Sequence, residues 1–144
     1  MLLFDVNVLV YAHRAELPQH KGVAAWLTRT IDGPEAFGIC DLVLSGFVRV
    51  VTHPKVFKTP SPVEQALRFC QALRERPNAV VIGAGRRHWN IFNELCLSSR
   101  ATGNLVPDAF LAALALESGS EWITSDAGFA RFPNLRWRRP QIEV

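Results

Sequence analysis

Short apolar runs along the chain predict buried strands. Each run is only a few residues long and ends at a polar or turn residue, which is typical of strands covered on both faces of a parallel sheet. The runs lie at residues 2–4, 36–40, 79–82 and 121–124, and residues 135–137 can add a short last strand.

Longer segments between these runs carry apolar residues at helical spacing. They predict helices over residues 6–15, 18–30, 42–52, 61–76, 87–100 and 106–117. Segment 42–52 is so rich in Val and Leu that it could also form a strand, but its length favours a helix. The start Ser61-Pro62-Val63-Glu64 predicts a helix whose N-cap is Ser61. Alternating strands and helices indicate an α/β domain with a mostly parallel sheet of four to five strands and helices on both faces.

Length and composition limit the class of protein. A chain of 144 residues corresponds to a single domain, 1–144, and 49% hydrophobic with 20% charged residues excludes a disordered chain. No apolar run reaches the roughly 18–20 residues of a membrane span. The start has no basic segment before its apolar residues, so we expect no signal peptide. Cys40, Cys70 and Cys96 form no CxxC pair and do not have the spacing of a zinc site. An odd number of cysteines without a signal peptide indicates reduced thiols in a cytoplasm.

The charge balance is mild. Sixteen basic against thirteen acidic residues give a net charge of +3, which alone barely favours a polyanionic partner. A cluster near the C-terminus holds Arg131, Arg136, Arg138 and Arg139. This cluster is equally consistent with a solvated basic surface and with a phosphate-binding patch.

Three aspartates stand out by their positions. Asp5 follows the first apolar run, Asp126 follows the run at 121–124, and Asp108 lies in the first turn of the helix before that run. Because the carboxyl ends of parallel strands meet at one edge of a sheet, we expect Asp5 and Asp126 to be neighbours there. Asp108 joins them if its helix starts at the same edge.

Three carboxylates at one edge repel each other, and a divalent cation removes the conflict. Mg²⁺ or Mn²⁺ prefers such oxygen ligands, so we expect a metal site formed by Asp5, Asp108 and Asp126. Polar neighbours that could orient the carboxylates or metal-bound waters are Asn7, Thr124 and Ser125. Purely structural roles remain open, because Asp108 can complement a helix dipole and Asp126 can cap a short helix over 127–131.

Three motifs resemble a known family. Leu3-Phe4-Asp5-Val6-Asn7-Val8-Leu9, Gly103-Asn104-Leu105-Val106-Pro107-Asp108-Ala109 and Trp122-Ile123-Thr124-Ser125-Asp126-Ala127-Gly128-Phe129 are similar to motifs of the PIN-domain ribonucleases, and more narrowly of the VapC toxins. Each motif alone is weak, but their order and spacing extend the resemblance over essentially the whole chain.

The resemblance implies a three-layer α/β/α fold and Mg²⁺- or Mn²⁺-dependent endonucleolytic cleavage of RNA, such as tRNA or rRNA. It also implies a prokaryotic, cytoplasmic toxin that is inhibited by a VapB-type antitoxin, and usually a homodimer. Asp5, Asp108 and Asp126 match the first, third and fourth acids of the family.

This chain departs from the family pattern at the position of the second acid. That acid is usually a Glu in the helix after the second strand, and the matching position here is Gly46. Asp41 could supply a fourth catalytic carboxylate from the start of the same helix, or Ser45 could act through a water. Otherwise Asp41 is an ordinary helix N-cap residue. The departure leaves the number of metal ions open.

Other classes of function fit less well. An aspartyl phosphatase usually has a second Asp two residues after the first, where this chain has Asn7, and no phosphate-binding glycine motif is present. The main alternative is a module with the nuclease fold that binds RNA or antitoxin without cutting, because the second acid is lost.

Overall fold

Helices and strands alternate along the chain as the apolar pattern predicts. The computed structural model describes residues 1–142. Its elements are β1 (Leu2–Phe4), α1 (Val6–His13), α2 (His20–Asp32), β2 (Phe37–Ile39), α3 (Asp41–Val51), α4 (Val63–Arg74), β3 (Ala79–Val81), α5 (His88–Ser99), α6 (Leu105–Ser118), β4 (Glu121–Ile123), the 3₁₀ helix η1 (Ala127–Arg131) and β5 (Trp137–Arg138). The ambiguous segment 42–52 is helical, as its length suggested.

The five strands form one sheet in the order β3-β2-β1-β4-β5, and each neighbouring pair is parallel. Phe4 at the end of β1 lies opposite Ile123 at the end of β4. The backbone N–H of Asp5 continues the ladder by donating to the carbonyl of Ile123 at 2.9 Å. The residues after β1 and β4 therefore emerge side by side at one edge of the sheet.

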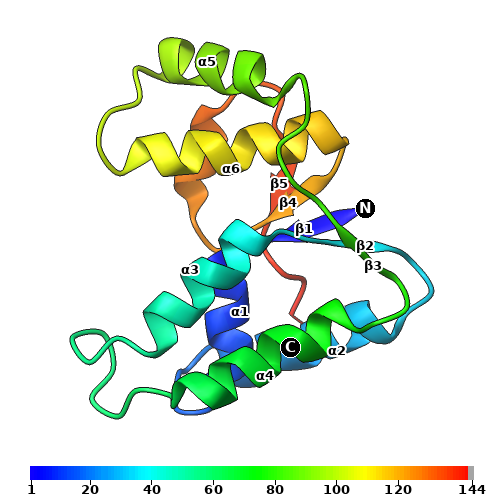
Figure 1. Ribbon diagram of the computed structural model, residues 1–144, viewed down its shortest axis with the longest axis vertical. Coiled ribbons are helices and arrows are strands. Elements are labelled where there is room, and N and C mark those ends of the chain that lie inside the picture. Colours follow the sequence, from blue (N-terminus) through cyan, green and yellow to red (C-terminus); the bar gives the residue numbers. More distant parts are fainter. Residues whose placement is uncertain (143–144) are drawn as a thin grey trace.

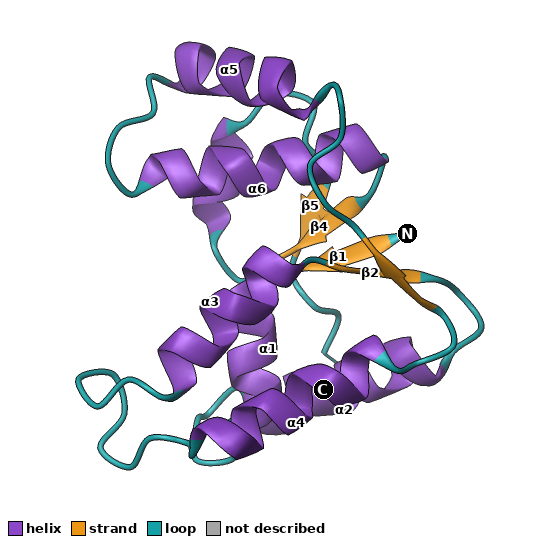
Figure 2. Cartoon of the chain, in the orientation of Figure 1, coloured by secondary structure: helices purple, strands orange, loops and turns teal. Residues whose placement is uncertain are grey.

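Helices cover both faces of the sheet and make a three-layer α/β/α domain. Figure 1 shows α5 and α6 on one side of the sheet, with α1, α2 and α4 on the other. Figure 2 shows the same arrangement, with purple helices on both sides of the orange strands. Right-handed crossovers explain it: the chain moves from β1 to β3 in one direction, and then returns across the sheet to β4.

Helix α6 is rich in buried apolar residues and lies between α5 and the sheet. Its buried residues are Ala109, Leu111, Ala112, Ala113, Leu114 and Ala115. Pro107 is tolerated in its first turn, where the backbone N–H has no partner within the helix. Gly119 ends α6 in the left-handed conformation, with φ 66°, which glycine adopts without steric cost. Within residues 1–142, none of the helices combines the length and hydropathy needed to cross a membrane.

The predicted cap of α4 is wrong. The helix begins at Val63, and its N-cap is Pro62, which makes no side-chain capping hydrogen bond. The buried Ser61 hydroxyl instead accepts a hydrogen bond from Arg14 Nη1 at 2.9 Å and lies 3.0 Å from His13 Nε2. The Ser61 hydroxyl that the local sequence predicts as the helix cap thus interacts with His13 and Arg14 at the end of α1 instead.

Candidate active site

Three aspartates line one cavity of about 340 Å³ beside the carboxyl ends of β1 and β4. Asp5 follows β1, Asp126 follows β4, and Asp108 comes from the first turn of α6. The strand order reverses between β1 and β4, which is where parallel α/β sheets place their ligands. The predicted convergence of these three residues is present in the structure.

Asp5 is buried and held by three donors. Its Oδ1 accepts the backbone N–H of Val6 at 2.7 Å, while its Oδ2 accepts the Thr124 hydroxyl at 2.6 Å and the Asn7 amide at 3.2 Å. Burial raises the pKa of Asp5, and these hydrogen bonds oppose the rise. The carboxylate is therefore fixed in one orientation toward the cavity.

Thr124 connects the ends of the two strands. Its side chain is fully buried, and its Oγ1 accepts both the backbone N–H of Asp126 at 3.0 Å and the Asn7 amide at 3.2 Å. Asn7 Oδ1 in turn accepts the backbone N–H of Ser125 at 3.1 Å. Asn7 and Thr124 thus touch Asp5 through their side chains, while Ser125 joins the network through its backbone.

Asp126 is exposed at the mouth of the cavity and has a second contact. Its Oδ1 accepts the backbone N–H of Gly128 at 2.8 Å and so caps η1. The capping role expected for Asp126 is present together with its place in the cavity. One oxygen is occupied by the cap, and this hydrogen bond holds the carboxylate in position.

The pKa of the Asp108 carboxyl group reflects the burial and the negative charge of the site. Burial raises its pKa to about 6, with further contributions from the negative charges of Asp5 and Asp126, while Arg131 opposes them. Like charges close to one another favour a protonated carboxyl group. Of the C-terminal arginine cluster, Arg131 is the member near the acids, which its position in the sequence did not reveal.

The donor set fits a hard divalent cation. Within residues 1–142, no three His, Cys, Asp or Glu side chains are close enough to ligate one ion together. Mg²⁺ does not need them to be, because it keeps several waters and binds through one or two carboxylates. Three oxygen-donor side chains around one cavity, mutually repelling, suit such a hydrated ion.

Asp41 lies apart from the three aspartates. Its exposed carboxylate pairs with Arg74 of α4, and it lines a different hollow, between α3 and α4. Five residues of α-helix rotate a side chain by about 140° around the axis, so Asp41 and Gly46 face different directions. A Cβ on Gly46 would meet Val6 Cγ2 at 3.0 Å, which places Gly46 against α1.

The cavity wall near Gly46 is apolar. Val6, Val10 and Val50 line the cavity on this side, and Phe129 adds a further apolar surface. The fourth carboxylate expected from the family pattern therefore has no counterpart here, and the acidic side of the cavity consists of Asp5, Asp108 and Asp126.

Comparison with known proteins gives the family. A model described as "PIN domain" matches residues 2–135. Ribonuclease VapC43 of Mycobacterium tuberculosis is 46% identical over 140 residues, covering 97% of this chain and 95% of the relative. Ribonuclease VapC25 of the same species is 37% identical over 142 residues, covering 99% and 100%.

A solved structure agrees in fold. VapBC2 from Rickettsia felis, bound to a DNA fragment from its promoter, superposes with a TM-score of 0.72 at 19% identity, covering 96% of this chain and 97% of that one. The family model and the two relatives establish that the chain belongs to the PIN-domain family and, within it, to the VapC ribonucleases.

Proposed function

We propose that this VapC ribonuclease is a metal-dependent endoribonuclease in which Asp5, Asp108 and Asp126 hold Mg²⁺ or Mn²⁺ and RNA is cut at the cavity they share. The observation that carries the proposal is the meeting of these carboxylates at the junction of β1 and β4. When bound, the ion supplies an activated water and offsets negative charge on the reacting phosphate.

The side chains around the site orient the carboxylate of Asp5, attract the phosphate and restrict the entry of water. Thr124 and Asn7 fix the Asp5 carboxylate, so the geometry of the site exists before substrate arrives. Arg131 places a positive charge near Asp108, where it can attract a phosphate. The apolar wall of Val6, Val10 and Val50 limits the water that reaches the acids.

We further propose that a VapB-type antitoxin inhibits the protein and that the protein forms a homodimer in a prokaryotic cytoplasm. The Rickettsia felis neighbour is a VapBC complex, which supports the antitoxin partner. Exposed apolar side chains on α5 support a protein-covered face: Trp89 is 67% exposed and Leu97 is 72% exposed.

Cleavage of total cellular RNA by purified, antitoxin-free protein tests the activity. Reactions contain Mg²⁺, Mn²⁺ or EDTA, and Asp5→Ala is run beside the wild type. We expect discrete fragments that require metal and vanish in the variant. The fragment ends identify which RNA is cut.

The alternative is a PIN-fold module that binds RNA or antitoxin without cutting. The apolar wall at Gly46 and the distance of Asp41 from the cavity are the observations that favour it. Absence of cleavage with either metal, from protein shown to be folded, would support this alternative and reject the enzyme.

A further inference from the structure

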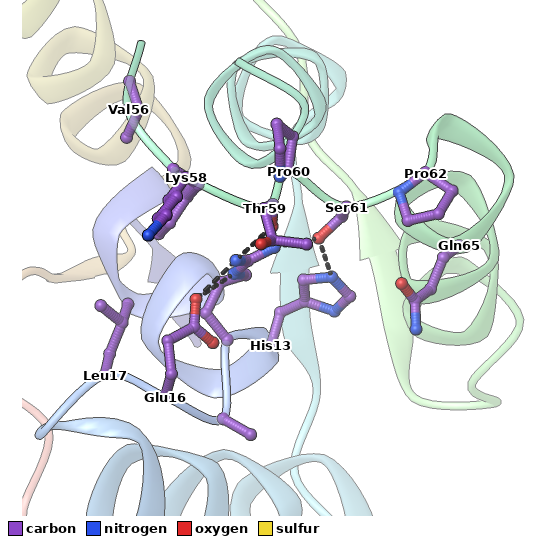
Figure 3. A pocket seen from close by; sticks show the side chains of 13 residues that line it. His13, Glu16, Leu17, Val56, Lys58, Thr59, Pro60, Ser61, Pro62 and Gln65 are labelled. Carbon is purple, nitrogen blue, oxygen red and sulfur yellow. Dashed lines mark hydrogen bonds and ion pairs between the residues drawn. The ribbon is translucent and has the colours of Figure 1, made fainter. Parts of the chain in front are cut away.

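A second cavity, of about 680 Å³, lies where the end of α1 meets the segment that joins α3 to α4 (Figure 3). We call it the loop cavity; its lining includes His13, Arg14, Leu17, Phe57, Lys58 and Ser61. Its volume is within the roughly 300–1,000 Å³ of sites that hold small ligands. None of its lining residues belongs to the cavity lined by Asp5, Asp108 and Asp126, which we call the catalytic cavity.

Arg14 holds the loop cavity open. Its side chain is only 11% exposed, and its guanidinium donates to Glu16 Oε1 at 2.7 Å, to the Thr59 carbonyl at 2.7 Å and to Ser61 Oγ at 2.9 Å. The guanidinium also lies 4.2 Å from the centre of the Phe57 ring. A segment without regular structure is thereby pinned to α1, so the cavity is formed before any ligand arrives.

The inner lining of the loop cavity combines neutral polar groups with the Arg14 guanidinium. Ser61 Oγ accepts a hydrogen bond from Arg14 and lies 3.0 Å from His13 Nε2 (Figure 3). Burial lowers the pKa of His13, which favours the neutral imidazole. Hydroxyl, imidazole and guanidinium groups can hydrogen-bond the edge of a nucleobase or stack on its face.

The segment that forms one wall of the loop cavity is basic, and Lys58 from it lines the cavity together with the exposed Glu16. Between Asp41 and Glu64 the chain carries no acidic residue, but it carries Arg49, Lys55 and Lys58. All three are exposed, and within residues 1–142 none of them forms an ion pair. Uncompensated cations of this kind attract the phosphates of a nucleic acid.

The basic segment connects the two cavities. Val50, next to Arg49, lines the catalytic cavity, and residues 56–62 line the loop cavity. The two cavities also share α1, because Asp5 precedes its first residue and His13 is its last. Eight helical residues span about 12 Å, a distance that a short stretch of single-stranded RNA covers.

We infer that the loop cavity receives an unpaired base of the RNA substrate, a short way along the strand from the cleaved bond, while Lys55 and Lys58 contact the adjoining phosphates. Two exposed side chains at the cavity, Glu16 and Gln65, offer a carboxylate and an amide to the base edge. Proteins select RNA sequence mostly through unstacked bases in pockets of this kind. The inference rests on the proposed ribonuclease function and adds a site that selects where the enzyme cuts.

RNA binding without cleavage tests the inference. Fluorescence anisotropy is measured in EDTA, with a labelled single-stranded RNA of about ten random nucleotides and with a duplex of the same length. We expect the single strand to bind more tightly. Lys55→Ala and Lys58→Ala should each lower the slope of log affinity against log salt by about 0.7, as expected for one lost phosphate contact on a single strand.

The chain offers a matched control for charge. Lys21, at the start of α2, is the other lysine of the sequence and lines neither cavity. Lys21→Ala removes the same charge and should leave the salt slope unchanged. Equal slopes for Lys21→Ala and Lys58→Ala would overturn the inference, because the lysines would then act only through net charge.

A filled cavity gives the second test. Gln65→Trp places a large ring at the loop cavity, and Gln71→Trp places it two turns along the same helix, outside the cavity. We expect Gln65→Trp to weaken single-strand binding roughly tenfold, to leave duplex binding unchanged and to alter the pattern of fragments cut from total RNA. Gln71→Trp should behave like the wild type, and circular dichroism confirms that both variants are folded.

The outcomes separate this inference from the proposed function. If the wild type cuts RNA and binds the single strand, but Gln65→Trp changes neither affinity nor fragment pattern, the loop cavity is not a base site while the ribonuclease stands. If Gln65→Trp instead only prevents a co-expressed antitoxin from copurifying, the cavity takes a protein and the inference is wrong. If the wild type neither binds nor cuts RNA, both proposals fail.

Discussion

The catalytic cavity and the loop cavity lie along the same helix, α1, but they are built in opposite ways. The catalytic cavity is acidic, and its side chains come from strand ends and helix starts that the sheet holds in place. The loop cavity is bordered by a basic segment and depends on one arginine, Arg14, that pins this irregular segment to α1. The proposed chemistry thus lies on the rigid scaffold, and the proposed recognition lies on a connection that can change its sequence without changing the scaffold.

The largest expected effect comes from the catalytic cavity. Asp5→Asn keeps the size of the side chain but removes its charge, and we expect cleavage to fall by roughly 10²–10³-fold, as for the loss of one preorganised electrostatic group. RNA affinity in EDTA should not weaken. Rates of fragment formation and anisotropy measure the two effects separately.

Asp41→Asn is the matched control. It removes the exposed ion pair with Arg74, which contributes at most about 1 kcal/mol to the free energy of unfolding. We expect its cleavage rate to stay near that of the wild type. A loss as large as that of Asp5→Asn would show that Asp41 reaches the site after all.

The next effect concerns the loop cavity. Arg14→Met keeps the apolar stem but leaves the Thr59 carbonyl and Ser61 hydroxyl without their donor, and we expect it to lower the free energy of unfolding by about 2–3 kcal/mol. Hydrogen exchange should quicken at residues 52–62 more than at β1 or β4. Urea unfolding and exchange mass spectrometry check the two parts, and uniform quickening over the whole chain would contradict a local clamp.

Thr124→Val sharpens the comparison from the catalytic side. The swap keeps the shape of a fully buried side chain but removes the donor to Asp5 and the acceptor for the Asp126 N–H. We expect a loss of about 1–3 kcal/mol in the free energy of unfolding, together with slower cleavage. Thr124→Ser retains the hydroxyl and should preserve most of the rate; if it is as slow as Thr124→Val, packing rather than hydrogen bonding is responsible.

The smallest effect is a pH dependence of the metal-free protein. Because the pKa of Asp108 is raised from 3.8 to about 6, the folded state prefers the protonated form. The stability that this proton provides is fully present below about pH 4 and is lost as the pH rises through about 6. After allowance for solvent around a half-buried group, we expect a decrease of about 1–2 kcal/mol.

Thermal unfolding in EDTA at pH 4.5 and pH 7 measures this change, and Asp108→Asn is its control. The variant cannot ionise, so it should unfold at a higher temperature than the wild type at pH 7 and lose the difference near pH 4.5. Wild-type stability that rises between these two values in step with the variant would contradict the raised pKa.

The sequence predicts the catalytic cavity better than the loop cavity, and the reason is physical. Asp5 and Asp126 follow apolar runs, and parallel strands place their carboxyl ends at the same edge of the sheet. To predict the position of Asp108, one must also know at which edge of the sheet α6 starts. The return of the chain from β3 to β4 determines this edge. The pairing of β1 with β4 itself cannot be read from local patterns.

Contacts between distant residues explain what the sequence did not predict. Ser61 has the sequence signature of a helix cap, yet Arg14, 47 residues earlier, occupies its hydroxyl. Asp41 was a candidate because it lies in the correct helix, but the rotation of that helix points it toward Arg74. The loop cavity arises from a segment without periodicity, so no apolar pattern marks it.

The pairing of β1 with β4 also determines the stage of synthesis at which the proposed active site can form. Asp5 is among the first residues made, whereas the partner that orients it, Thr124, lies 119 residues later. A chain interrupted before β4 lacks both Thr124 and Asp126, so Asp5 has neither the partner that orients it nor the complete cavity. We therefore expect the growing chain to have no ribonuclease activity until β4 has entered the sheet.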